Sequence, residues 1–255
     1  MTAMATSPFD ITGARALVTG SSKGIGKALA RALVEAGADV ILNARTAQAL
    51  ERTREELADA GPGPVRIAAF DVTDEDQVRD GLARVGPIDI LVNNAGMQRR
   101  APLTDFATAD FDAVMTTNVR SVFLVTREAA RGMIDRGRGK VIVIASVQSE
   151  LARPGIAPYS ASKGAVRMLV KGMCADLATA GICVNAIAPG YFATELTSAL
   201  VADEDFTSWV QARTPAGRWG RVEDLTGTLL WLASPASDFV NGQTIFVDGG
   251  MTAVL

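Results

Sequence analysis

The chain has 255 residues, a formal net charge of −3 and no histidine. A chain of this length forms one or two domains, and a single α/β domain of this size is common. Without histidine, His-ligated zinc sites and His-based nucleophile triads are excluded, and the small acidic charge leaves no basic surface for nucleic acid. Cys174 and Cys183, the only cysteines, form neither a metal-binding spacing nor a disulfide framework. We therefore expect no metal site and no nucleic-acid partner.

No segment of the sequence is apolar for long enough to cross a membrane. The longest apolar runs, such as Val141–Ala145, have the length of a strand. Met1 to Asp10 carries no positive charge and no apolar core, so it does not resemble a signal peptide. We expect a cytoplasmic protein with no membrane partner.

Short β-rich runs alternate with helical patterns along the whole chain. Strands are predicted at Ala14–Thr19, Asp39–Ala44, Val65–Phe70, Ile88–Val92, Lys140–Ala145, Cys183–Ala188 and Thr244–Val247. Helices are predicted at Ile25–Ala36, Thr46–Ala60, Glu75–Arg84, Ala109–Arg136, Tyr159–Ala180 and Val222–Ala233. This alternation predicts right-handed crossovers and a parallel sheet covered on both faces, in a doubly wound α/β fold.

No repeat or linker divides the chain, so a single domain over residues 1–255 is expected. One stretch is irregular: at about 190–221, proline, glycine and aromatic residues accumulate where a crossover helix is expected. A long excursion from a compact domain often covers a site. The pattern predicts a lid over a substrate site.

A glycine-rich turn, Thr19–Gly26, lies between the first strand and the first helix. Glycines in this position allow a tight turn and a close approach of backbone N–H groups to a pyrophosphate, and the helix N-terminus adds a positive dipole end. The spacing G-x-x-x-G-x-G differs from the commoner G-x-G-x-x-G, and a surface turn with three glycines is the alternative. We expect a dinucleotide-binding turn.

Tyr159 and Lys163 lie four residues apart, on one face of a predicted helix, and thirteen residues after Ser146. An ammonium group about 4 Å from a phenol, at an effective dielectric constant of about 20, contributes roughly 4 kcal/mol. This is enough to bring the pKa of a tyrosine close to neutral, where general acid–base catalysis works best. The alternative is an exposed tyrosine and a solvated lysine on an ordinary helix.

Ser146 follows a predicted strand, at the carboxyl edge where sites form in parallel sheets. Its hydroxyl and the Tyr159 phenol could both reach one reacting oxygen and stabilise the charge that develops there. In isolation, Ser146 is equally typical of a helix cap or a turn. Asn118, within a helical pattern, is typical of a side chain that bonds to backbone.

The combination of these motifs is more specific than any one of them. Thr19–Gly26, Asn93–Gly96, Asn118, Ser146, Tyr159 with Lys163, and Pro189-Gly190 together resemble the motif series of the short-chain dehydrogenase/reductase family, from about residue 10 to the C-terminus. The resemblance implies a Rossmann-type, three-layer fold with a seven-stranded parallel sheet. It also implies a nicotinamide cofactor, reversible hydride transfer between a carbinol and a carbonyl, and a homotetramer.

The resemblance also implies a role for each catalytic residue. Tyr159 would be the proton donor or acceptor, and Lys163 would lower its pKa and hold the nicotinamide ribose. Ser146 would bond the reacting oxygen, and Asn118 would hold a water relay to Lys163. The implied cofactor-binding residues are Gly20, Ser22, Lys23, Gly24, Ile25, Gly26, Arg45, Asp71, Val72, Asn94, Ala95, Gly96, Tyr159, Lys163, Pro189, Gly190, Phe192 and Thr194.

The end of the second predicted strand favours NADP(H) over NAD(H). NAD sites usually place an acidic residue there, on the ribose 2′-hydroxyl. This chain has Ala44-Arg45 instead, and Asp39 lies at the start of the strand. Lys23 and Arg45 would favour a 2′-phosphate, unless they are merely solvated surface cations. Asp71 resembles an adenine-binding residue, and an Asx turn is its alternative.

Several further stretches resemble family members that act on sugar acids, among them Gly96–Arg100, Ser146–Leu151 and Gly190–Glu195. They imply that the substrate is a sugar acid, with interconversion of D-gluconate and 5-keto-D-gluconate as the expected reaction. Arg100 is expected to meet the carboxylate, and Gln148 and Glu150 to bond the polyol chain. The expected substrate residues are Arg100, Ser146, Gln148 and Tyr159. A solvated loop tip is the alternative for Arg99 and Arg100.

Phe192, Trp209 and Trp219 are expected to supply apolar contacts of the lid, or else to bury a small core of the lid itself. Three alternatives to the expected reaction stay open. The first is reduction of a 3-oxoacyl group on a carrier protein, which would require a basic docking surface. The second is another sugar or polyol dehydrogenase. The third is a non-catalytic NADP-sensing protein, although Asn118, Ser146, Tyr159 and Lys163 are all retained.

Overall fold

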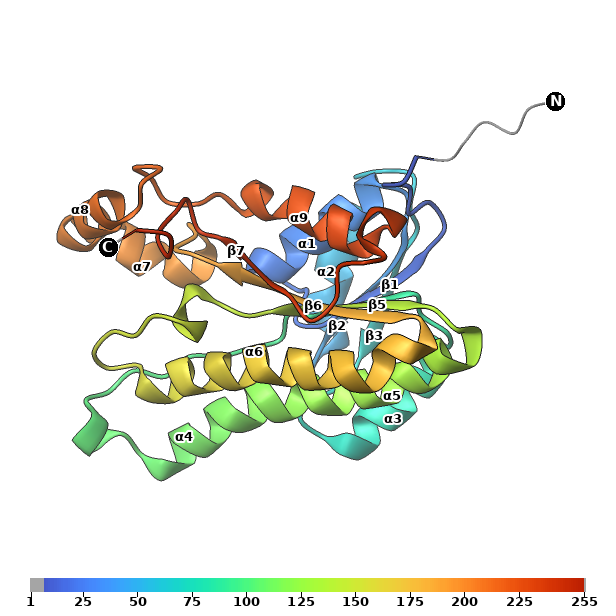
Figure 1. The fold of residues 1–255 in the computed structure, drawn as a ribbon, viewed down its shortest axis with the longest axis horizontal. Helices are drawn as coiled ribbons and strands as arrows, with labels where there is room; N and C mark the ends of the chain where they lie inside the picture. The colour runs from blue at the N-terminus through green and yellow to red at the C-terminus, as the bar shows by residue number, and fades with distance from the viewer. Residues whose placement is uncertain (1–6, 255) are drawn as a thin grey trace.

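A computed structural model describes residues 7–254 of the chain, except for the side chain of Leu196. Its centre is a seven-stranded sheet in which every neighbouring pair of strands is parallel (Figure 1). The strands are β1 Arg15–Val18, β2 Asp39–Ala44, β3 Val65–Ala69, β4 Ile90–Asn93, β5 Gly139–Ile144, β6 Ile182–Pro189 and β7 Thr244–Val247. All seven strand predictions and the Rossmann-type α/β fold are thus confirmed.

The order of the strands, β3-β2-β1-β4-β5-β6-β7, places β1 and β4 side by side at the point where the direction of winding reverses. In open α/β sheets, ligands bind at the carboxyl ends of the strands at such a point. Here the glycine-rich turn follows β1, and Asn94–Gly96 follows β4. Ser146 follows β5, and β6 ends at Pro189, so the predicted site residues lie along one edge.

Successive residues of the central strands face opposite sides, because side chains alternate along a strand. Leu17, Leu91 and Val141 pack in the core on one side of the sheet. Val18, Ile90 and Ile142 pack on the other side. A strand buried on both faces must be apolar throughout, which is why these strands are continuous apolar runs in the sequence.

Two layers of helices cover the sheet (Figure 1). On one face lie α1 Gly24–Glu35, α2 Ala47–Leu57 and α9 Thr226–Ala233. On the other lie α3 Glu75–Val85, α4 Thr108–Met115, α5 Ser121–Arg136 and α6 Ala157–Leu177. Within the described residues, no helix is long and apolar enough to cross a membrane.

The helix predicted at Ala109–Arg136 is not continuous. A π-helical turn, Thr116–Arg120, separates α4 from α5 and contains Asn118. π-turns insert one extra residue into a helix and are frequent at functional sites. The predicted helix at Val222–Ala233 likewise begins with a 3-10 turn at Val222–Leu225.

Residues 190–221 leave the sheet after β6 and carry two short helices, α7 Ser198–Val201 and α8 Glu204–Arg213. The segment returns to its own start, because Phe192 pairs with Gly220 in an isolated parallel bridge. A side chain at Gly220 would lie 2.8 Å from the Phe192 ring, so this contact requires glycine. Val254 lies beside α8, where Arg213 Nη2 donates to Val254 O at 3.1 Å.

Candidate active site

The glycine-rich turn has the shape of a phosphate cradle. Gly20 and Gly24 have φ angles of 62° and 55°, which favour glycine. A Cβ atom on Gly26 would lie 2.3 Å from Asn94 Nδ2 and 2.4 Å from Gly20 O. The lack of side chains therefore lets the turn, the start of α1 and the β4 loop approach each other closely, as the phosphates of a dinucleotide require.

Two polar side chains hold this cradle together. The Thr19 hydroxyl accepts hydrogen bonds from the backbone N–H groups of Asn94 and Ala95, at 3.0 and 3.1 Å. Asn94 Nδ2 donates to the carbonyls of Thr19 and Gly20, at 2.9 and 3.0 Å. The start of α1 has no acidic residue in its first turn and no side-chain cap, so its positive end is open to an anion.

Lys23 and Arg45 are both exposed, at the glycine turn and just after β2. Among the described residues, neither forms an ion pair, whereas Asp39 binds two arginines, Arg15 at 3.1 Å and Arg66 at 3.0 Å. Asp39 is thus occupied at the amino end of β2, and the carboxyl end carries only positive charge. This arrangement suits a phosphate on the ribose better than a free 2′-hydroxyl.

Asp71 and Val72 follow β3 on the same edge. Asp71 Oδ1 accepts hydrogen bonds from the N–H and hydroxyl of Thr73, at 2.8 and 2.7 Å. This is the Asx turn that leads toward α3, and it holds Asp71 beside buried Val72.

On the far side of the cradle, Thr194 lies in a short turn. Its N–H donates to Thr197 Oγ1 at 2.9 Å, and that hydroxyl donates to Phe192 O at 2.7 Å. A Cβ atom on Gly190 would lie 2.9 Å from Asp248, so the chain passes β7 closely before it reaches Thr194.

Tyr159 and Lys163 lie in the first two turns of α6, where Pro158 is near the N-terminus of the helix. Lys163 is 6% exposed, and its Nζ donates to Ile144 O, at the end of β5, at 2.7 Å. The same Nζ lies 5.8 Å from the centre of the Tyr159 ring. The helix therefore holds the phenol and the amine together at the carboxyl edge of the sheet.

Asn118 is buried in the π-turn and bonds to backbone. Its Nδ2 donates to Met97 O at 2.9 Å, and its Oδ1 accepts from Met97 N at 2.8 Å. It also bonds Ser162 Oγ at 3.0 Å, next to Lys163. Asn118 thus joins the loop after β4 to the helix that carries Tyr159 and Lys163.

Ser146 lies in extended backbone just beyond β5, and its hydroxyl accepts from Gln148 N at 3.2 Å. The side chain also hydrogen-bonds with the Tyr159 phenol, which lowers the pKa of that phenol. Burial has the larger effect, so the pKa of Tyr159 is raised overall. Burial also lowers the pKa of Lys163 to about 8.

The expectation that Lys163 brings the pKa of Tyr159 toward neutral is therefore wrong for the protein alone. The ammonium lies against the ring and bonds to Ile144 O rather than to the phenol oxygen, while loss of water around the phenol opposes ionisation. Tyr159 is a protonated acid at neutral pH.

A cavity of about 110 Å³ opens beside this group. Ser146, Tyr159, Gln148 and Arg100, the four predicted substrate residues, all line it. Gln148 is 9% exposed, and its Oε1 is buried with no hydrogen-bond partner among the described residues.

Arg99 and Glu150, which were also predicted for this mouth, do not line the cavity. Arg99 pairs with Asp110 at 3.2 Å, whereas Arg100, within the cavity, donates from Nη2 to Gln98 Oε1 at 3.2 Å. Glu150 pairs with Arg167 and does not line the cavity, so its expected contact with a polyol chain is not supported.

Among the cavity residues that were not predicted from the sequence are Arg153 and Tyr191. The Arg153 guanidinium lies over the Phe206 ring of α8, 5.6 Å from its centre. The Tyr191 hydroxyl is buried and donates to no acceptor among the described residues, and a hydrogen bond from Arg153 lowers the pKa of its phenol, against the larger effect of burial. A sequence signal did exist for Arg153: an arginine seven residues after Ser146, in the loop that leads to the Tyr159 helix.

The aromatic residues of the 190–221 segment form a small core of their own. Rings of Phe206, Trp209 and Trp219 lie around Tyr191, with centres 5.6, 5.6 and 5.8 Å from its ring. Trp209 and Trp219 therefore bury a small core of the segment itself, which is the second of the two roles expected for them. Phe192 is buried and lines the substrate cavity.

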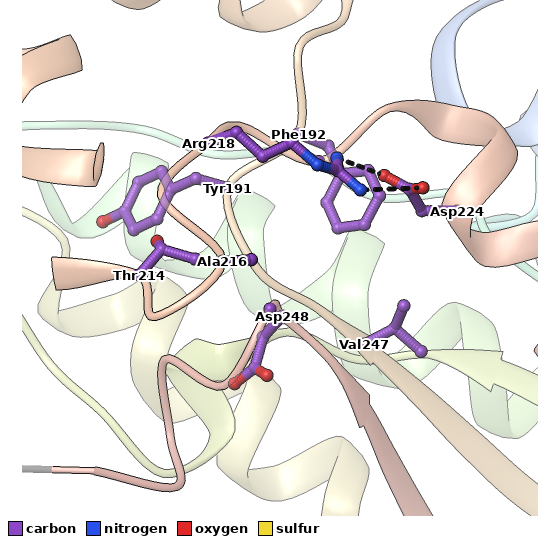
Figure 2. A pocket seen from close by; sticks show the side chains of 10 residues that line it. Tyr191, Phe192, Thr214, Ala216, Arg218, Asp224, Val247 and Asp248 are labelled. Atoms are coloured by element: carbon purple, nitrogen blue, oxygen red, sulfur yellow. Dashed lines mark hydrogen bonds and ion pairs between the residues drawn. The ribbon is translucent and has the colours of Figure 1, made fainter. Parts of the chain in front are cut away.

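A second cavity, of about 150 Å³, lies behind Tyr191 and Phe192. Figure 2 shows the Arg218 guanidinium forked onto the Asp224 carboxylate at its rim, with the Tyr191 phenol pointing away from that pair. The two cavities share Tyr191 and Phe192. Within the described residues, no cluster of three or more acidic or cysteine side chains is arranged to hold a metal ion.

Comparison with known proteins places the chain in a family. Residues 20–252 match the family model described as enoyl-(acyl carrier protein) reductase. With the fold, the glycine turn and the Ser146–Tyr159–Lys163 group, this match shows that the chain belongs to the short-chain dehydrogenase/reductase family, as the sequence motifs predicted.

Three similar proteins that cover nearly the whole chain have names that refer to gluconate or its 5-keto derivative. The chain is 57% identical to gluconate 5-dehydrogenase of Gluconobacter oxydans, over 97% of this chain and 98% of the relative. It is 50% identical to 5-keto-D-gluconate 5-reductase of Escherichia coli, over 95% and 97%. A solved gluconate 5-dehydrogenase from Burkholderia cenocepacia, in complex with NADP and tartrate, is 55% identical, with a TM-score of 0.92 over 97% and 98% of the two chains.

Proposed function

We propose that the protein is an oxidoreductase that interconverts D-gluconate and 5-keto-D-gluconate with NADP(H). The observation that carries the proposal is the substrate cavity, in which the Ser146 and Tyr159 hydroxyls share a space with the Arg100 guanidinium and the Gln148 amide. A carbonyl can meet the two hydroxyls while a carboxylate meets the guanidinium. Support also comes from two relatives, at 57% and 50% identity, whose names state this chemistry.

The cofactor would lie along the carboxyl edge of the sheet, from the cradle of Gly20, Gly24 and Gly26 to Lys163. When bound, NADPH supplies the hydride. The protein's own share is to hold the substrate oxygen between the Ser146 and Tyr159 hydroxyls, where charge develops. Tyr159, protonated at neutral pH, donates its proton to that oxygen, and the nearby Lys163 ammonium stabilises the phenolate that forms.

Asn118 supports this group as a positioning residue. It holds the Met97 backbone, and through Ser162 it reaches the helix turn of Tyr159, because Ser162 Oγ donates to Tyr159 O at 2.7 Å. The family role of a water relay to Lys163 stays a proposal for Asn118.

We infer a preference for NADP(H) over NAD(H) from Lys23 and Arg45. A phosphate on the ribose would meet two exposed cations, whereas a 2′-hydroxyl would find no acidic partner at the end of β2. An Arg45→Ala variant should raise the KM for NADPH about tenfold, since one charge-assisted contact contributes about 1.5–3 kcal/mol when fully formed and less at an exposed site. The KM for NADH should stay within about twofold, and an equal change for both cofactors would contradict the inference.

The proposal has three further features, of which only the tetramer comes from the family resemblance. The chain acts as a single domain over 1–255, in which the 190–221 segment covers the substrate cavity as a lid. It is a cytoplasmic protein, and it assembles as a homotetramer. Phe111, Phe123 and Met168 support the assembly, since they are exposed on α4, α5 and α6, which lie together on one face of the sheet.

The test is NADPH oxidation with 5-keto-D-gluconate, run beside an acetoacetyl thioester. Steady turnover with the keto acid and little with the thioester is expected, because the cavity carries two guanidinium groups for an anionic substrate. Activity with the thioester alone would replace the proposal with carrier-protein chemistry. NADPH binding without turnover of either substrate would favour the non-catalytic reading.

A further inference from the structure

The substrate cavity contains a second arginine. Both Arg100 and Arg153 line it, yet among the described residues neither pairs with a carboxylate. Neighbouring arginines do pair: Arg99 with Asp110, Arg167 with Glu150 and Arg218 with Asp224. Two unpaired guanidinium groups in one small cavity are therefore a local feature that calls for an anion.

The cavity also holds a hydrogen-bond donor that is already out of water. Tyr191 Oη is buried next to the Arg153 guanidinium and donates to no acceptor among the described residues, and Gln148 Oε1 is buried without a partner. A buried polar group without a partner destabilises the folded protein, because it has lost its hydrogen bonds to water. A bound carboxylate would accept from the Tyr191 hydroxyl, and a substrate hydroxyl would donate to Gln148 Oε1. Both groups are therefore satisfied by one polyhydroxy acid.

Electrostatics indicates that these groups are close together. The charge of Arg153 lowers the pKa of Arg100, after the larger effect of burial. Burial raises the pKa of the Tyr191 phenol, and the charges of Arg153 and Arg100, together with a hydrogen bond from Arg153, oppose that rise. Two like charges that are partly removed from water repel each other, and an anion between them removes the repulsion.

We propose that Arg153 is a second carboxylate-binding residue, which together with Arg100 and the Tyr191 hydroxyl forms an anion subsite of the substrate cavity. The subsite rests on the proposed function and deepens it, because it assigns the charged end of the substrate to the side of the cavity formed by the 190–221 segment. Ser146 and Tyr159 are left for the reacting oxygen.

The position of Arg153 also explains how the subsite is held. Its guanidinium stacks on Phe206 of α8, and Phe206 packs edge-on against Tyr191, 5.6 Å between ring centres. A cation on an aromatic face is fixed in orientation, with its edge free to donate to a carboxylate. The anion subsite therefore joins the loop before α6 to the 190–221 segment.

The experiment compares D-gluconate with its neutral amide, D-gluconamide, as substrates for NADP⁺-dependent oxidation. The two share one polyol chain and differ only in the group that meets the subsite. In Arg153→Gln, the ratio of kcat/KM for acid over amide should fall at least tenfold, mainly through KM for the acid. Arg153→Lys should retain part of the preference, since it keeps the charge without the fork. Tyr191→Phe, which keeps the ring packing, should lower the ratio about threefold.

Arg99→Gln is the matched control, because Arg99 is on the Arg100 loop but pairs with Asp110 outside the cavity. It should leave the ratio unchanged. An unchanged ratio in both Arg153→Gln and Tyr191→Phe, with wild-type turnover of gluconate, would overturn the subsite and leave the proposed function intact.

If the wild type oxidises neither compound, the proposed function fails. A measurement of gluconate binding then tests the anion subsite separately. Trp209 and Trp219 lie beside Tyr191, so gluconate bound at the subsite should change their fluorescence. A change that is lost in Arg153→Gln supports the subsite. No change in the wild type at high gluconate concentration overturns it.

Discussion

At the residue scale, burial is the largest cause of the pKa shifts of the acid–base pair, Tyr159 and Lys163. Lys163 is nearly enclosed, its Nζ donates to Ile144 O, and its pKa falls to about 8. Tyr159 loses water as well, and its pKa rises, with only the Ser146 hydrogen bond acting in the opposite direction. The protein alone is therefore poised to donate a proton, as the reduction of a carbonyl requires, rather than to accept one.

This pair predicts the pH dependence of reduction. The pKa of Lys163 is lowered, so its ammonium is present below about pH 8 and is lost as the pH rises through that value. The neutral amine cannot stabilise the Tyr159 phenolate, so kcat/KM for the keto acid should fall above about pH 8. A solvated lysine would place this decline near pH 10.4. A profile measured from pH 6 to 10 that stays flat to the end would contradict the role of Lys163.

At the element scale, the strands were predictable, whereas the break in the 109–136 helix and the helices α7 and α8 were not. The strands are buried on both faces, so their apolar runs stand out in the sequence. The π-turn at Thr116–Arg120 adds one residue to a helical turn, and the apolar pattern of 109–136 continues through it. Hydrophobic periodicity does not resolve one extra residue, so the sequence predicts an ordinary helix through the turn that buries Asn118.

The nucleotide cradle gives a prediction at this scale. In Gly26→Ala, the new methyl group would lie 2.3 Å from Asn94 Nδ2 and 2.4 Å from Gly20 O, too close for the turn and the β4 loop to keep their contact. NADPH binding, measured by fluorescence titration, should weaken at least tenfold. Gly227→Ala in α9 is the control, because no atom lies within 4 Å of its new methyl group. Full affinity in Gly26→Ala would contradict the cradle.

For the molecule as a whole, the candidate site divides into a part that the sequence predicts and a part that it does not. Ser146, Tyr159, Lys163 and Gln148 lie on or just beyond elements with clear patterns, so their convergence at one edge followed from the order of the strands. Arg153 and Tyr191 come from two loops that meet only because the 190–221 segment folds back on itself. No local pattern encodes that contact.

The surface of the molecule leads to a prediction about assembly. Phe123 and Met168 are 44% and 62% exposed on α5 and α6, and such apolar surface is typical of subunit contacts. Light scattering coupled to gel filtration should give a mass of four chains of 26.7 kDa each. A Phe123→Glu, Met168→Glu double variant should give a smaller species with an intact circular dichroism spectrum. A monomeric wild type would rule the tetramer out.

The central claim is that Tyr159 donates the proton in the reduction of a sugar-acid carbonyl. The most direct measurement is NADPH oxidation with 5-keto-D-gluconate by the wild type and by Tyr159→Phe. The wild type should turn over steadily. The variant should lose about 10²–10⁴-fold in kcat, the range that general acid catalysis supplies, while its NADPH affinity stays within about threefold. A variant that retains the full rate, or a wild type that does not reduce the keto acid, would contradict the account.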